Sequence, residues 1–190
     1  MQTNFIKILE MGSERAVADM AVMALEDHPE GFPDMLGLCF LEKYPLSMRA
    51  SRVVQLYCEK YPESISPYID EVIEKIIVSR IDGVKRNFVK IFAEFIDLGK
   101  IADPGLLLNA CFAWLQDPSQ KPALRIHSMT LIFKLTKQEP ELLCELKATL
   151  EMIDEDSEIS IRTCARKMLK RLDKSRQSAV GSQQSSRKTL

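Results

Sequence analysis

Residues 86–95 read RNFVKIFAEF, and the apolar residues in this stretch are spaced as on one face of an α-helix. Phe88 is followed by Ile91, Phe92 and Phe95, which lie three, four and seven residues further on. Side chains at these spacings project from the same side of a helix. The stretch therefore predicts an amphipathic helix whose aromatic face packs into a core.

The same four-position pattern recurs four more times along the chain. Each instance begins with an apolar or small residue and has further such residues three, four and seven positions later. The other four sets are Val17, Met20, Ala21 and Ala24; Ala50, Val53, Val54 and Tyr57; Ser128, Leu131, Ile132 and Leu135; and Ala165, Met168, Leu169 and Leu172. Successive instances start 33, 38, 40 and 37 residues apart. The pattern predicts five helices, with Ala50, Phe88, Ile91, Leu131 and Leu169 buried between them.

A proline marks the start of another helix in each interval between these patterns. Pro33, Pro67, Pro104 and Pro140 are 34, 37 and 36 residues apart. Proline suits the first turn of a helix, where its missing N–H has no partner to lose. Ser66 and Asp103 directly precede two of them and are good N-cap residues, which predicts helices over about 67–79 and 104–116.

A helix pair that repeats at this interval resembles the HEAT and armadillo-like helical repeats. Those families place an arginine early in the second helix of each pair. Arg15, Arg49, Arg86, Arg125 and Arg162 occupy that place here. The resemblance covers about residues 3–173 and implies an all-α fold, a right-handed α-α superhelix (HEAT-like solenoid) of about five helix pairs. We expect residues 1–173 to form this domain and residues 174–190, which are basic and rich in Ser and Gln, to form a disordered tail.

Composition agrees with a single helical domain. The chain has 190 residues, 46% of them hydrophobic, with only 7 Gly, and its net charge of −1 excludes a globally basic nucleic-acid binder. The five cysteines include no CxxC pair and are predicted to be small buried hydrophobes in a reducing compartment. The sequence shows no signal peptide and no apolar run of about 20 residues, so we expect a cytoplasmic protein without a membrane partner.

Catalytic and metal-binding patterns are sparse. The two histidines, His28 and His127, cannot form a multi-histidine metal centre, and no phosphate-binding glycine loop or nucleophile motif occurs. We therefore expect no enzyme activity, no cofactor and no metal. HEAT-like folds include DNA glycosylases, but Trp114, the sole tryptophan, lies in an apolar helix and is predicted to be a core residue.

The distribution of charged residues indicates the candidate binding site. Residues 162–190 hold nine Lys and Arg and one acidic residue, a net charge of +8, so the rest of the chain carries −9. In HEAT-like proteins the second helices line the concave face, and basic residues recur at positions that would point out of the core there. They are Arg52, Lys90, Lys137, Lys167 and Lys174. A solvated face and the helix dipole also explain these charges.

The function that this pattern favours is a non-enzymatic scaffold or adaptor. Its concave face would bind a protein or an acidic peptide, and no oligomeric state is predicted. The alternative is a nucleic-acid-binding HEAT-like protein with a DNA glycosylase-like fold and no catalysis. The basic C-terminal region lacks aromatic residues, which disfavours stacking on single strands.

Overall fold

The computed structural model describes residues 2–101, 103–153 and 157–186, and the side chains of residues 5–99, 101, 103–153 and 157–173. The described residues form ten α-helices and three short 3₁₀ segments, with no β-strand among them. The first helices of the pairs are α1 (Gln2–Glu10), α3 (Phe32–Cys39), α5 (Ile69–Val78), α7 (Pro104–Gln116) and α9 (Leu142–Glu151). The second helices are α2 (Arg15–Asp27), α4 (Leu46–Lys60), α6 (Asp82–Glu94), α8 (Pro122–Leu135) and α10 (Ile159–Ser186).

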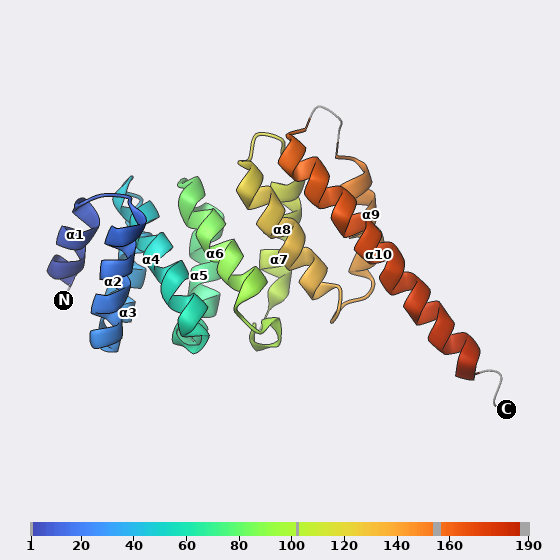
Figure 1. Ribbon diagram of the computed structural model, residues 1–190, viewed down its shortest axis with the longest axis horizontal. Helices are drawn as coiled ribbons and strands as arrows, with labels where there is room; N and C mark the ends of the chain where they lie inside the picture. Colours follow the sequence, from blue (N-terminus) through green and yellow to red (C-terminus); the bar gives the residue numbers. More distant parts are fainter. Residues whose placement is uncertain (1, 102, 154–156, 187–190) are drawn as a thin grey trace.

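The five helix pairs stand side by side in a row that runs from the N-terminus to the C-terminus (Figure 1). Each second helix packs on its own first helix and also on the second helix of the next pair, from α2 through α4, α6 and α8 to α10. The all-α repeat architecture of about five pairs, predicted from the sequence, is confirmed.

The core lies between the helices of each pair and between neighbouring pairs. The predicted buried faces of α4 and α8 are fully buried, and on α6 Phe88, Ile91 and Phe92 have no exposed surface. The Phe88 ring stacks on Phe40 with ring centroids 5.2 Å apart, which joins the second pair to the third. A buried hydrogen bond from Asn87 Nδ2 to Ser51 Oγ (2.9 Å) crosses the same boundary. Trp114 is buried, as predicted.

The register predicted for α2 is wrong by one residue. Its buried residues are Ala18, Ala21, Val22 and Leu25, whereas Met20 is 46% exposed. This face places the branched side chains of Val22 and Leu25 in the core and leaves the unbranched methionines in solvent. Two smaller departures concern Phe95 and Leu169, which lie next to the core but are only half-buried.

The observed start of α7 agrees with the start predicted from the sequence, and the observed start of α5 does not. α7 begins at Pro104, and the Asp103 carboxylate accepts a hydrogen bond from the Gly105 N–H at 2.9 Å. Pro67 instead lies inside the 3₁₀ segment Pro62–Tyr68, and α5 begins after it. The Ser66 hydroxyl donates to Glu63 Oε2 (3.3 Å), so Ser66 is not the N-cap that the sequence predicts.

Cysteine burial also departs from the prediction in part. Cys39, Cys58 and Cys111 are buried, Cys164 is half-buried and Cys144 is exposed on α9. α9 belongs to the last pair of the row, so it has a neighbouring pair on one side only, and its outer face meets solvent (Figure 1).

Two further expectations concern the ends and the membrane. α10 continues through residues 174–186 of the predicted disordered tail, and residues 187–190 lie outside the described residues, so the disorder of residues 174–190 stays a prediction. Among the helices of the described residues, none combines the length and apolar character needed to cross a bilayer.

Candidate binding face on the second helices

The candidate site is the solvent-facing side of the second helices, which we call the second-helix face. Of the predicted residues, Arg52 lies on α4 and Lys90 on α6, and both are half-buried. Lys137 is exposed just after the end of α8, and Lys167 is exposed on α10. The side chain of Lys174 lies outside the described residues.

Two of these residues lie in a basic cluster, together with an arginine that was not predicted as part of the site. Arg52 and Arg86 line one pocket between α2, α4 and α6. Lys90 follows Arg86 by four residues on α6, a spacing that places both side chains on one side of the helix. We call Arg52, Arg86 and Lys90 the α4–α6 basic cluster. From the sequence, Arg86 was identified only as one of the repeat-pattern arginines. Its spacing of four residues from Lys90 could have indicated that it belongs to the candidate site.

The repeat-pattern arginines have different roles. Arg49 donates from Nε to Ser13 Oγ and from Nη1 to the Leu9 carbonyl, both at 2.8 Å, and so closes the end of α1. Arg125 is buried and donates from Nε to the Leu115 carbonyl (3.0 Å) near the end of α7. These two arginines satisfy carbonyls that a helix end leaves without partners. Their role is structural.

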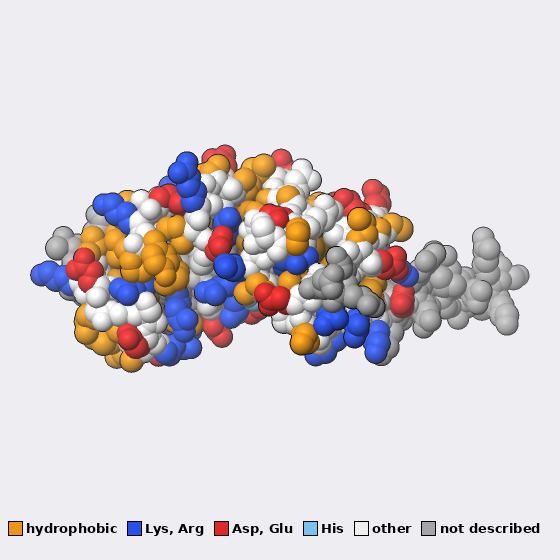
Figure 2. Space-filling model, turned by 90° about the horizontal axis from the view of Figure 1, so that it is seen from above, with side chains coloured by type: hydrophobic (Ala, Val, Ile, Leu, Met, Phe, Trp, Pro, Cys, Tyr) orange, Lys and Arg blue, Asp and Glu red, His pale blue; other side chains and the backbone are white. Residues whose placement is uncertain are grey.

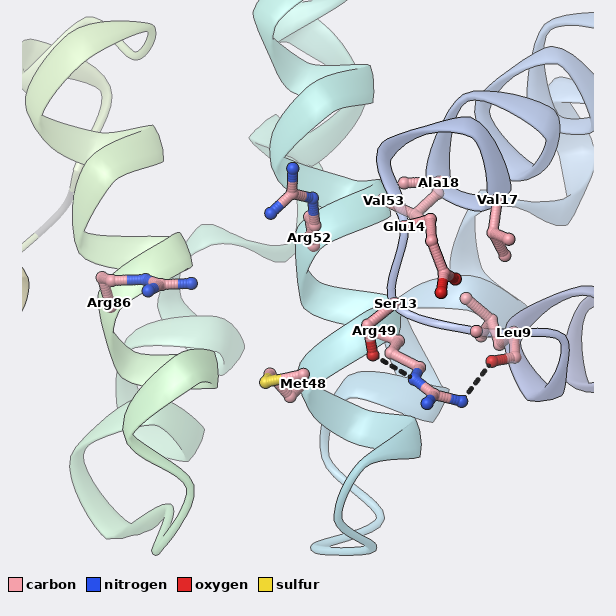
Figure 3. Close-up of a pocket in the computed structure, with 11 residues that line it drawn as sticks. Leu9, Ser13, Glu14, Val17, Ala18, Met48, Arg49, Arg52, Val53 and Arg86 are labelled. Atoms are coloured by element: carbon pink, nitrogen blue, oxygen red, sulfur yellow. Dashed lines mark hydrogen bonds between the residues drawn. The ribbon is translucent and has the colours of Figure 1, made fainter.

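Arg52 and Arg86 are not used in this way. Among the described residues, the buried Nε of Arg52 has no hydrogen-bond partner. Within the same part of the chain, the Arg86 guanidinium donates only to the neighbouring Asn87 Oδ1, at 3.3 and 3.4 Å. Figure 3 shows Arg86 extending from α6 towards α4, while Arg49 turns the other way, towards Leu9 and Ser13. Neither guanidinium pairs with a carboxylate among the described residues.

The pKa of His127 on α8 reflects the positive charge of this region. Burial, together with the positive charges of Lys90 and Arg86, lowers the pKa of His127 to about 4. The Glu94 carboxylate, 3.6 Å from His127 Nδ1, would favour the charged imidazole, but the burial and the two cations outweigh it. His127 is thus a half-buried helix residue that is neutral at physiological pH.

Other lysines on this face are partly engaged. Lys90 Nζ lies 3.9 Å from Glu94 Oε2, which is a loose ion pair. Lys134 donates to the carbonyls of Phe92 and Ile96 at the end of α6, a capping role that spacing in the sequence did not reveal. Seen from above, towards one edge of the row of pairs, Lys and Arg side chains are interspersed with acidic and apolar ones (Figure 2).

The chain offers little for redox or metal chemistry within its described part. Burial raises the pKa of the Cys58 and Cys111 thiols to about 12, so both are protonated at neutral pH. No group of three or more His, Cys, Asp and Glu side chains in that part is arranged to hold a metal ion. The arginines and lysines of the second-helix face are hydrogen-bond donors suited to an anionic partner.

Comparison with known proteins gives one match. A family model described as HEAT repeat domain matches residues 6–172, nearly the range over which the sequence resembles such repeats. No curated protein and no solved structure matches the chain significantly.

Proposed function

Because the chain belongs to the HEAT repeat family, we propose that it is a non-enzymatic scaffold or adaptor that binds an acidic segment of a protein through its second-helix face. Stacked helices give a preformed surface, which limits the entropy lost on association. The α4–α6 basic cluster carries the proposal, because it presents Arg52 and Arg86 without a carboxylate partner among the described residues.

The charge distribution favours a short acidic segment over a long nucleic acid. Lys90 is flanked by Glu94, and residues 1–161 carry a net charge of −9. A duplex that runs along the second helices would meet this negative charge, whereas a short peptide need only reach the cluster. Lys137 and Lys167 extend the proposed surface towards α10, where the chain is most basic.

The test is capture of partners from native cell extract by the wild type and by a Lys90→Glu, Lys167→Glu double variant. The double variant is expected to fold, as judged by circular dichroism, and to lose a specific partner that the wild type retains. The matched control is an Arg80→Glu, Lys121→Glu double variant, which changes the net charge equally at exposed positions before α6 and α8. Equal capture by all three folded proteins would show that the second-helix face is only a solvated surface.

Duplex DNA separates this proposal from nucleic-acid binding. We expect only weak binding of duplex DNA at physiological salt in fluorescence anisotropy. Tight binding that weakens with salt, with a log–log slope near ~0.9 per phosphate neutralised, would instead favour the nucleic-acid function.

A further inference from the structure

The pocket that contains Arg52 and Arg86 has the size of a small ligand site. Its cavity volume is about 120 Å³, whereas one water needs roughly 10–15 Å³ measured in a similar way. Residues of the α1–α2 segment form one side of it, Arg52 and Val53 of α4 lie in the middle, and Arg86 reaches in from α6 (Figure 3).

The arginines in this pocket lack a paired carboxylate among the described residues. A buried N–H without a partner loses its hydration and gains nothing in return, so the orphaned Nε of Arg52 indicates a missing acceptor. The Arg49 guanidinium is held by Ser13 and Leu9. Glu14 also lines the pocket, but among the described residues it forms no ion pair with Arg52 or Arg86. None of the described side chains therefore supplies an acceptor for this N–H.

Part of the lining is apolar and suits a short hydrocarbon stem. Val17 and Met48, both half-buried, line the pocket with the arginines and would cover methylene groups. We propose that this pocket binds a carboxylate on a short aliphatic stem, with its oxygens accepting hydrogen bonds from Arg52 and Arg86. The carboxylate comes either from a free dicarboxylic acid or from a glutamate side chain of a bound segment. This inference rests on the proposed function, because the same two arginines carry both, and it names the chemical group that they bind.

The experiment follows the arginine Nε–H signals of the intact protein by NMR during titration. The ligands are glutarate, for a free acid, and N-acetyl-glutamate amide, for a side chain, with N-acetyl-glutamine amide as the neutral control. We expect a saturable shift of the Arg52 Nε–H signal with a carboxylate and none with the glutamine compound. Tighter binding of glutarate assigns the site to a free acid, and tighter binding of the capped glutamate assigns it to a side chain.

Four variants sharpen the test. Arg52→Gln and Arg86→Gln are each expected to weaken carboxylate binding about tenfold or more, the effect of losing a charge-assisted hydrogen bond. Glu14→Gln is expected to strengthen binding, because it removes a like charge from the wall. Arg80→Gln, which removes an exposed arginine outside the pocket, is expected to change nothing.

Three results would overturn the proposal. They are no shift of the Arg52 signal in the wild type at millimolar carboxylate, an equal shift with the glutamine compound, and equal weakening by Arg80→Gln. The wild-type titration decides the matter even if an arginine variant fails to fold. Because no partner is present, failure here leaves the capture experiment of the proposed function unaffected.

Discussion

At the scale of single residues, Phe92 carries much of the packing of α6, since its side chain is fully buried between neighbouring helices. Phe92→Ala removes most of that side chain and leaves a cavity, so we expect a loss of about 3–5 kcal/mol in the free energy of unfolding. Urea denaturation measures it. Phe95→Ala on the same helix is the control and is expected to cost much less, because Phe95 is half-buried.

His127 is expected to make stability depend on pH in a defined window. Its pKa is about 4 in the folded protein and about 6.5 in the unfolded chain, so between these values the unfolded chain binds more protons. Its contribution is therefore fully present above about pH 6.5 and is lost as the pH falls towards about 4.

Urea midpoints at several pH values check this expectation. His127→Gln is expected to lose less stability than the wild type over this window. His28→Gln, a change at an exposed loop histidine, is expected to behave like the wild type. A pH dependence unchanged by His127→Gln would contradict the expectation.

At the scale of elements, the two predicted N-caps differ in consequence. Asp103 caps α7 and Ser66 caps no helix. Asp103→Ala is expected to lower the unfolding free energy by about 0.5–2 kcal/mol, the usual cost of removing a cap. Ser66→Ala is expected to have almost no effect. Thermal unfolding of the two variants provides the comparison, and equal destabilisation would be inconsistent with the structure.

Helix pairing could be predicted from the sequence because apolar spacing reflects burial directly. The faces of α4, α6 and α8 are flanked by neighbours on both sides, so their patterns are nearly complete. The register of α2 could not be predicted, because Val17, Met20 and Ala21 fit the helical spacing as well as Ala18, Ala21 and Val22 do. Local spacing cannot choose between adjacent faces, and packing on α4 makes that choice.

At the scale of the whole molecule, the candidate site too could be predicted from the sequence only in part. Positions that point out of the core were predictable, and they include Arg52 and Lys90. The different roles of the arginines were not predictable: Arg49 reaches the Leu9 carbonyl, Arg86 reaches the Asn87 side chain, and the Arg52 Nε has no partner among the described residues. That depends on how neighbouring pairs stack, which no single helix encodes.

The row of pairs is expected to open from its ends. Each pair packs only on its neighbours, so the middle helices α4, α6 and α8 have support on both sides and α1 and α9 do not. Amide hydrogen exchange should therefore show the slowest exchange in α4, α6 and α8 and faster exchange in α1 and α9. Uniform protection across these helices would indicate a single cooperative unit instead.

Several bonds between pairs run from a later residue back to an earlier one. Arg49 reaches the Leu9 carbonyl 40 residues before it, Asn87 reaches Ser51 36 residues before it, and Lys134 reaches the Phe92 carbonyl 42 residues before it. As the chain emerges from the ribosome, each pair must therefore wait for about one more repeat before its last polar groups find partners. Synthesis and assembly can proceed in step, with one incomplete pair at the growing end.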